Sequence, residues 1–243
     1  MDIHVISIFP EMFPPVLDVG IVGRAQKAGL ATIHVHDLRD HTHDRHRSVD
    51  DAPFGGGPGM IMRPEPLFEA IEAIAAPAGS PVVVLTPQGK PFHQRDAERL
   101  ATQETIVFIC GRYEGIDERA RQALGTEELS LGDYVLTGGE LPTMVVIDAI
   151  VRLLPGALGH GETAIADDSH TSGLLQHPQY TRPAEFRGES PPDVLLSGDH
   201  AAVDQWRRNE ALRRTLERRP DLLAQADLSE RDTIELLRLG WQP

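Results

Sequence analysis

The sequence predicts an α/β fold with a parallel sheet, followed by a small helical domain, and three observations favour this. Short apolar runs alternate with helical patterns up to residue 155, which is typical of parallel strands joined by crossover helices. Residues 156–173 are rich in small and polar residues and have no sustained period. Two further helical patterns follow a Pro-rich stretch. We therefore expect a domain at residues 1–155, a flexible linker or lid at 156–173 and a helical domain at 174–243.

In the first domain, apolar runs bounded by turn residues predict strands at Ile3–Ile8, Ala31–Val35, Val82–Leu85 and Ile106–Cys110. Amphipathic patterns predict helices at Glu11–Ala28, Pro64–Ala75, His93–Ala101, Asp117–Ala123 and Leu141–Leu153. Beyond the linker, the patterns predict helices at Asp199–Arg219 and Ser229–Leu239. The last of these opens with Ser229 and has Asp232 three residues on, a variant of the capping-box spacing.

The composition is that of a globular protein without membrane segments. Hydrophobic residues make up 40% and charged residues 25% of the chain, which argues against intrinsic disorder. No stretch reaches the roughly eighteen apolar residues that span a bilayer, and the start lacks the basic region of a signal peptide. We expect a cytoplasmic protein. Cys110 is the single cysteine, which excludes an internal disulfide, and its place in an apolar run predicts a buried thiol.

The charge distribution restricts any nucleic-acid surface to a local one. The formal net charge is −14, which argues against a surface that binds phosphates throughout. Residues 1–169 carry 13 Lys+Arg against 25 Asp+Glu, whereas residues 170–243 carry 10 against 12. Six of those ten are arginines between 207 and 219, in a helical pattern that also contains Trp206. This helix is either a phosphate-binding surface with an aromatic for stacking or a solvated amphipathic helix.

Two loops of the first domain have unusual compositions. Phe54–Met60 contains GGGPG but lacks both nucleotide fingerprints, so it is either a place where a ligand or partner approaches the backbone or a flexible turn. Arg39–Arg47 matches no familiar zinc spacing, and contact with a polyanion or a solvated loop explains it better than a metal. Its candidate metal ligands are His41, His43, Asp44 and His46.

Three glycine-containing segments, Thr86–Gly89, Cys110–Ile116 and Ser130–Pro142, follow strands or turns of the first domain. The carboxyl ends of parallel strands are where α/β folds build ligand pockets. These segments therefore either form a pocket or are simply turns that follow core strands. Tyr113 and Tyr134 are candidates to face an adenine or ribose there. Ser169 is not set in a GxSxG elbow, which disfavours hydrolase chemistry.

Several segments, in their order along the chain, resemble the bacterial tRNA (guanine-N1)-methyltransferase family nearly end to end. Their number makes chance similarity negligible. The matching segments are Ser7–Phe13, Thr42–Asp51, Phe54–Met60, Thr86–Lys90, Cys110–Asp117, Ser130–Pro142, Asp168–Ser169, His177–Pro183 and Val194–Arg207.

The resemblance implies a SPOUT-type fold, in which a parallel sheet carries a C-terminal trefoil knot that holds S-adenosyl-L-methionine, followed by a helical tRNA-binding domain. It implies methyl transfer to N1 of the guanosine at position 37, 3′ of the anticodon. It also implies a homodimer whose subunits share active sites. Two alternatives stay open: a non-catalytic RNA-binding protein on the same scaffold, and a nucleotide-dependent hydrolase that uses the glycine-rich loop.

The resemblance also implies residue roles, in which Asp168 is the general base and Arg152 faces the guanine. The implied donor contacts are Thr86, Pro87, Gly89, Gly111, Tyr113, Leu131, Gly132, Asp133, Tyr134, Val135, Leu136 and Gly138. Asp50, Gly57 and Gly59 would hold the target guanosine, and Glu114 is the candidate for a Mg²⁺ contact. Charge alone suggests that tRNA phosphates meet Arg207, Arg208, Arg213 and Arg214. His170 departs from the family, in which Phe is common at that position.

Overall fold

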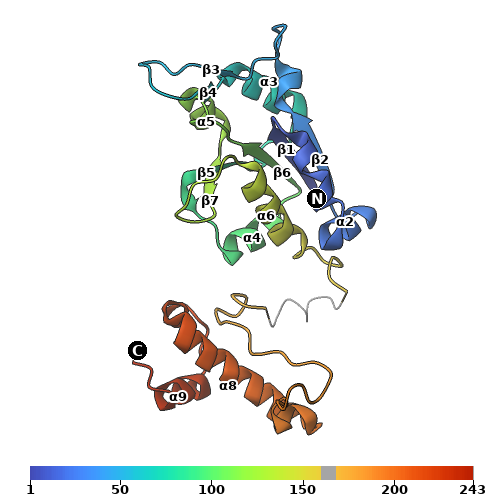
Figure 1. Cartoon of the computed structure of the whole chain (residues 1–243), viewed down its shortest axis with the longest axis vertical. Helices are drawn as coiled ribbons and strands as arrows, with labels where there is room; N and C mark the ends of the chain where they lie inside the picture. The colour runs from blue at the N-terminus through green and yellow to red at the C-terminus, as the bar shows by residue number, and fades with distance from the viewer. Residues whose placement is uncertain (160–167, 243) are drawn as a thin grey trace. The chain divides into compact units, whose positions relative to one another are not determined.

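The computed structural model of the chain describes residues 1–159 and 168–242 (Figure 1). These residues belong to two compact units, residues 1–161 and residues 162–243. The middle of the predicted linker lies outside the described residues. The predicted domain boundaries therefore stay a prediction.

The first unit contains a five-stranded parallel sheet, as the alternating pattern predicted. Its strand order is β2-β1-β6-β5-β7. Every residue of the central strand β6 is buried, because helices cover both faces of the sheet. The strands are β1 (Asp2–Ser7), β2 (Thr32–Asp37), β5 (Val82–Pro91), β6 (Thr105–Cys110) and β7 (Glu127–Ser130), and a separate antiparallel pair is formed by β3 (Asp50–Asp51) and β4 (Ile61–Met62).

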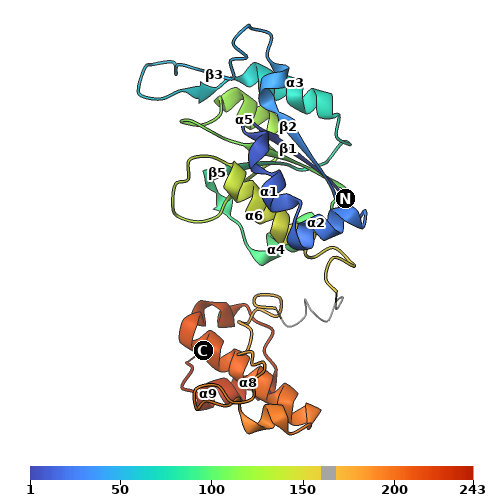
Figure 2. The same ribbon diagram turned by 45° about the vertical axis from the view of Figure 1, so that its right-hand side comes forward.

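Alternation of side chains along β1 divides the core into two layers. Ile3 and Val5 face one cluster, whereas Ile6 faces the other. The first cluster includes residues of α1 (Pro14–Leu17), α2 (Gly20–Lys27), α4 (Gln94–Ala101) and α6 (Glu140–Val151). The second includes residues of α3 (Pro64–Ile74) and α5 (Glu118–Leu124), so the helices flank the sheet on both sides (Figure 2).

The prediction of one helix at Glu11–Ala28 was wrong, because the segment is not continuous in the structure. The segment forms a 3₁₀ turn, Pro10–Met12, and then the separate helices α1 and α2. Two consecutive prolines open α1, and α2 begins at Gly20, whose φ is +62°. The structure also adds strand β7, whose sequence Glu-Glu-Leu-Ser has no apolar run because it lies at the edge of the sheet.

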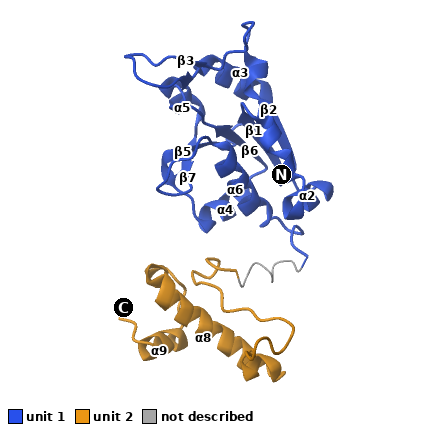
Figure 3. Cartoon of the chain, in the orientation of Figure 1, with its two compact units in different colours: residues 1–161 blue, residues 162–243 orange. Residues whose placement is uncertain are grey.

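The second unit is built around the two predicted C-terminal helices, α8 (His200–Arg218) and α9 (Glu230–Arg238) (Figure 3). Shorter 3₁₀ helices precede and follow α8, at Asp193–Leu196 and Pro220–Ala224. The core of this unit comprises Leu174, Leu212, Leu223 and Leu236.

The predicted capping box at the start of α9 is confirmed, since the Ser229 hydroxyl accepts from the Asp232 N–H and the Asp232 carboxylate accepts from the Ser229 N–H. The same carboxylate accepts two hydrogen bonds from Arg208, at 3.0 and 2.9 Å, and so ties α8 to α9. Among residues 1–159 and 168–242, no helix is both long and apolar enough to cross a membrane.

Replacing Asp232 by Asn should destabilise the second unit in a pH-dependent way. Hydrogen bonds from Arg208 lower the pKa of Asp232 to about 2. Because the folded pKa lies below the unfolded one, the stabilisation is complete above about pH 4 and is lost as the pH falls through about 2. We expect the variant to lose about 2 kcal/mol at pH 7 and little at pH 2.

Urea unfolding followed by tryptophan fluorescence measures this loss, because Trp206 and Trp241, the only tryptophans, both lie in the second unit. Glu235→Gln is the matched control on α9, since its 3.4 Å ion pair with Arg238 is exposed. A destabilisation by Asp232→Asn that does not change with pH would contradict the ion-pair account.

Candidate active site

A cavity of about 310 Å³ lies at the irregular middle of β5 and at the carboxyl ends of β6 and β7, and the three glycine-containing segments line it together. The structure thus brings to one place most of the residues expected to contact the donor. Those that line the cavity are Thr86, Pro87, Gly111, Tyr113, Leu131, Gly132, Tyr134, Val135, Leu136 and Gly138.

Two expected donor contacts, Gly89 and Asp133, do not line the cavity. A Cβ atom on Gly89 would lie 2.5 Å from the backbone nitrogen of Leu129, so glycine there lets β5 approach β7. Asp133 is exposed, at the outer part of the loop that follows β7. Their contact with a donor stays a prediction.

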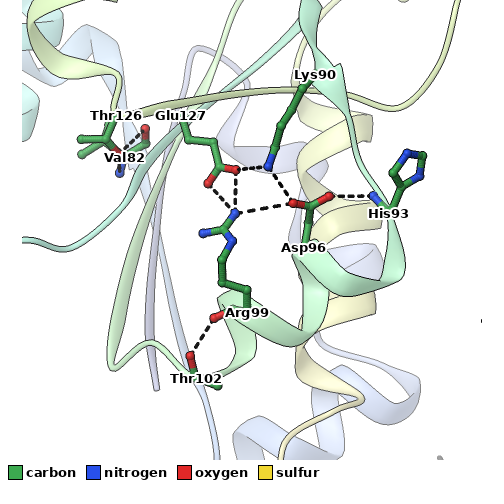
Figure 4. Close-up of polar contacts among 8 residues, drawn as sticks. All are labelled: Val82, Lys90, His93, Asp96, Arg99, Thr102, Thr126 and Glu127. Carbon is green, nitrogen blue, oxygen red and sulfur yellow. Dashed lines mark hydrogen bonds and ion pairs between the residues drawn. The ribbon is translucent and has the colours of Figure 1, made fainter. Parts of the chain in front are cut away.

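An irregularity in β5 shapes one wall of the cavity. Both Leu85 and Lys90 are paired with Leu129 of β7, so residues 86–89 bulge out of the ladder. An ion-pair network holds the end of this bulge (Figure 4). The Lys90 ammonium lies 2.8 Å from Asp96 and 3.1 Å from Glu127, and Arg99 lies 2.6 Å from Glu127.

A buried carboxylate organises the opposite wall. Glu140, at the first turn of α6, has no exposed surface. The Ser7 hydroxyl donates to one of its oxygens at 2.8 Å, and Arg112 Nε donates to the other at 2.8 Å. Arg112 also donates to the Thr137 carbonyl at 3.1 Å and lies over the ring of Phe9. One ion pair therefore joins the ends of β1 and β6 to the loop before α6.

Glycines allow the loop after β7 to reach β6. The Gly139 N–H donates to the Gly111 carbonyl at 2.8 Å, and Gly138 forms a bridge with Arg112. A Cβ on Gly138 would lie 2.1 Å from Arg112 Nε, and one on Gly139 would lie 2.8 Å from Cys110 Cα. Since β5 lies between β6 and β7, this loop crosses β5 on its way to β6, and its residues line the cavity.

The remaining wall rests on the glycine-rich loop between β3 and β4. The Glu114 N–H donates to the Met60 carbonyl at 3.0 Å, and its side chain lies where a Cβ on Gly59 would be. Gly57 has open space around it, and Phe54 is 98% exposed. The inner end of this loop therefore contacts the cavity wall, while its tip is open to solvent.

Tyr113 connects this wall to Asp50, the expected guanosine contact. Tyr113 has φ +60°, a strained value for a residue with a side chain. Burial first, and then the Asp50 carboxylate, raise the pKa of Tyr113, while Arg39 opposes them. The phenol therefore stays protonated, with Asp50 and Arg39 beside it.

Side chains of the histidine-rich loop, Arg39–Arg47, contact other residues of the protein. His43 lies 2.8 Å from Glu69, and the Asp44 carboxylate accepts from the backbone and side chain of Ser48. In the described part of the chain, no group of three or more His, Cys, Asp or Glu residues could hold a metal ion.

In the second unit, Asp168 opens a hydrogen-bonded turn held against α8. The Thr171 N–H donates to the Asp168 carbonyl, and the Ser169 hydroxyl accepts from the Gln176 N–H. The Leu175 N–H donates to Thr215 of α8. Asp168 lines a hollow of about 240 Å³ together with two of the predicted phosphate-binding arginines, Arg207 and Arg208. His170 has φ +76° and is exposed.

The four arginines expected to contact phosphates differ in their partners. Arg207 lies 3.3 Å from Asp204, and Arg208 pairs with Asp232. Arg213 pairs with both Glu210 and Glu217. Arg214 has no ion pair among the described residues. Arg152, the residue expected to face the guanine, follows the last turn of α6 in the first unit.

A family model described as tRNA (Guanine-1)-methyltransferase TrmD matches residues 1–225. Three curated relatives are each named tRNA (guanine-N(1)-)-methyltransferase. The relative from Frankia alni is 57% identical over 97% of this chain and 90% of its own length. Those from Dehalococcoides mccartyi and Brevibacillus brevis are each 54% identical, over 96% and 95% of this chain and 94% of their own lengths.

The chain belongs to the TrmD family of tRNA (guanine-1)-methyltransferases.

The family assignment confirms the resemblance, but sequence reasoning missed the ion pair that builds the site of this TrmD-family chain. Arg112 and Glu140 are 28 residues apart, and Ser7 is 133 residues from Glu140. A glutamate at the start of a mostly apolar helix was the signal that could have raised the question, because a buried carboxylate needs a partner. Its partner could not be named from spacing.

Removing either member of this pair should destabilise the first unit, but unequally. Arg112→Met leaves Glu140 buried without its counter-ion and should cost about 3 to 5 kcal/mol. Glu140→Gln keeps an acceptor for Ser7, and Arg112, whose side chain is 17% exposed, can turn toward water, so about 1 to 3 kcal/mol is expected.

Urea unfolding followed by far-ultraviolet circular dichroism measures both costs, since the first unit has no tryptophan. Arg24→Met, on the exposed side of α2, is the matched control and should change the free energy of unfolding by less than about 0.5 kcal/mol. Equal losses for the two variants would show that burial of Glu140 is not the source.

Proposed function

We propose that the chain transfers a methyl group from S-adenosyl-L-methionine to N1 of the guanosine at position 37 of tRNA, 3′ of the anticodon. The observation that carries this proposal is the convergence of the three glycine-containing segments on one cavity, beside the bulge of β5 and at the carboxyl ends of β6 and β7. Cofactors of α/β enzymes bind at such strand ends. The names of the relatives supply the substrate and the position on the base.

The cavity suits a nucleoside-like donor. Its volume of about 310 Å³ is within the usual range for small-molecule sites. Its glycines expose backbone amides and carbonyls, and Tyr113 and Tyr134 supply aromatic surface at its edge. All the implied donor residues keep this role in the proposal, with Gly89 acting through the close approach of β5 to β7.

The reaction needs a base more than it needs an activated methyl group. The positive sulfonium already activates the methyl group, because a neutral thioether leaves, whereas N1 of guanine carries a proton and is a poor nucleophile until that proton is lost. Asp168 would accept the N1 proton, and S-adenosyl-L-methionine held by the cavity residues would supply the methyl group to N1 and leave as S-adenosylhomocysteine. Negative charge spreads to O6 as the proton departs, and Arg152 stabilises it because a guanidinium stays charged.

Reaching N1 requires the base to leave its stack, because N1 lies on the Watson–Crick edge. Asp50, with Gly57 and Gly59 in the neighbouring loop, holds the extruded guanosine. Asp50 already lies beside Tyr113 at the cavity wall. Glu114 lies on the same wall and is the proposed Mg²⁺ contact; a single carboxylate with water and substrate oxygens is a mode that Mg²⁺ favours.

The second unit binds tRNA through local positive charge, at Arg207, Arg208, Arg213 and Arg214. Arg214 is available without breaking an ion pair of the described chain, whereas Arg213 has to exchange Glu210 and Glu217 for phosphate. We propose that the enzyme acts in the cytoplasm, where it would meet its tRNA substrate.

The proposed architecture is a trefoil knot in the first unit and a homodimer with shared active sites. The loop that passes from β7 over β5 to β6 supports the knot. Exposed apolar side chains on two packed helices support the dimer: on α6, Leu141 and Val145 are 51% and 52% exposed, and on α1, which contacts α6, Val16 is 49% exposed. Residues 1–155 act as the donor domain, 156–173 as the linker and 174–243 as the tRNA-binding domain.

The two alternatives lack a supporting observation. A non-catalytic RNA-binding protein would have no need for the intact cavity or for Asp168. A nucleotide-dependent hydrolase would need a phosphate-binding ending to the glycine-rich loop, and Phe54–Met60 has none.

A methyl-transfer assay on tRNA transcripts tests the function directly. With labelled S-adenosyl-L-methionine, a transcript with guanosine at position 37 should accept one methyl group, and the same transcript with adenosine there should accept none. Equilibrium binding of the donor compared with ATP separates this activity from the hydrolase alternative. Methylation that persists on the adenosine transcript would refute the assigned position.

Asp168→Asn should lower the single-turnover rate by about 10²–10⁴ while donor affinity stays within a few-fold of the wild type. The amide keeps the shape of the carboxylate but is not a base. Rapid-quench measurement of the rate and calorimetry of donor binding give the two quantities. A parallel loss of rate and donor affinity would assign Asp168 to binding.

A hybrid dimer of this variant tests the shared site. Gly111→Leu should block the cavity without disturbing Arg112, because a Cβ on Gly111 meets only ordinary contacts, whereas one on Gly138 would strike Arg112. Joining one Gly111→Leu subunit to one Asp168→Asn subunit leaves one complete site, so activity should return toward half. A hybrid as inactive as its parents would place each Asp168 in its own subunit's site.

A further inference from the structure

A second groove in residues 168–242 has a composition different from that of the donor cavity. It encloses about 320 Å³ between the segment 177–184 and the start of α8. Its aromatic residues are Tyr180 and Trp206, supported by His177. The size is within the range of small-molecule sites, so it can admit a nucleobase with its sugar.

The aromatic side chains form an ordered surface that is open on one side. His177, which is buried, contacts Trp206 edge-on at a centroid distance of 6.2 Å. Tyr180 lies 6.4 Å from Trp206 with the rings tilted by 52°, and 51% of Tyr180 is exposed. A half-exposed tyrosine backed by a tryptophan gives a planar ligand a rigid surface on which to stack.

The charge of the groove selects an anionic ligand. Arg182 and Arg207 line it, and no acidic residue does so among the described residues. Asp204, the partner of Arg207, lines the neighbouring hollow instead. In a chain of net charge −14, an aromatic groove with two arginines and no carboxylate is matched to a planar group that carries a phosphate.

The groove adjoins the hollow that contains Asp168. His177 and Arg207 line both, so the two spaces lie on either side of a shared wall within the second unit. A ligand in the groove is therefore a close neighbour of a base whose proton Asp168 accepts.

We propose that this groove binds an unpaired nucleotide that neighbours the target guanosine in the anticodon loop, with its base on Tyr180 and Trp206 and its phosphate at Arg182 and Arg207. This proposal rests on the proposed function. Extruding the guanosine costs stacking energy in the loop, and a stacking surface for a neighbouring base offsets part of that cost. The groove thereby helps to present the target to Asp168.

The test measures whether the effect of one side chain on tRNA affinity depends on one base of the anticodon loop. Binding is measured without methyl donor. The probes are a tRNA with guanosine at position 37 and a set of the same tRNA with one abasic nucleotide at each neighbouring loop position in turn. Tyr180→Leu should weaken binding of the intact tRNA by about 5- to 150-fold, whereas Tyr180→Phe, which keeps the ring, should bind within about twofold of the wild type. For the abasic tRNA that lacks the base proposed to bind in the groove, Tyr180→Leu should cause no further loss of affinity.

Two further measurements keep the proposal testable if Tyr180→Leu does not fold. Arg182→Gln should weaken binding and lower the salt dependence by about 0.7, the value for one single-strand phosphate contact, whereas Arg238→Gln, exposed on α9, should change neither. In a Trp241→Phe variant, intact tRNA should quench the fluorescence of Trp206, and the coupled abasic tRNA should not.

The proposal is overturned if no abasic position couples to Tyr180, if all tRNAs lose affinity equally in Tyr180→Leu, or if Arg182→Gln behaves like Arg238→Gln. Because the binding test involves no methyl transfer, its result is independent of the test of the proposed function. Coupling without methylation would refute only the proposed function, and methylation without coupling would refute only the groove.

Discussion

The buried carboxylate of Glu140 is the constraint on which the first unit depends. A charge with no exposed surface has to be neutralised and hydrogen-bonded, and Arg112 and Ser7 do both. These residues come from α6, from the loop after β6 and from the end of β1. Satisfying one carboxylate therefore fixes three chain segments at the same end of the strands, and Arg112 among them lines the cavity.

Glycines in the backbone complete the arrangement of segments that the ion pair of Arg112 and Glu140 organises. Gly138 and Gly139 let the loop after β7 lie directly against Arg112 and Cys110, and Gly89 lets β5 approach β7. The residues that line the cavity include several glycines, which have no side chain to cover their main chain. Such a wall offers fixed donors and acceptors that need no ordering of side chains when a ligand binds, which suits a donor that has to be held in one alignment for transfer.

The second unit, which we propose to bind tRNA, belongs to an acidic chain. Most arginines of α8 lie beside acidic partners, so the number of arginines overstates the charge available to RNA. What distinguishes its surface is arrangement: Asp168 shares a hollow with Arg207, and across the same wall Tyr180 and Trp206 form an aromatic groove without carboxylates. Recognition by stacking and a few phosphate contacts needs little net positive charge.

The sequence alone determined what local chemistry controls: the parallel α/β pattern, the helices α8 and α9, the capping box of Ser229 and Asp232, and the segments that line the cavity. It misjudged the residues around Pro14 and Gly20, where chain breakers override an amphipathic pattern, and β7, whose polar sequence forms a strand because β5 offers an edge. Only the tertiary structure paired Arg112 with Glu140 and Tyr180 with Trp206. Periodicity reports which face a residue occupies, whereas these partners are chosen by how distant segments pack.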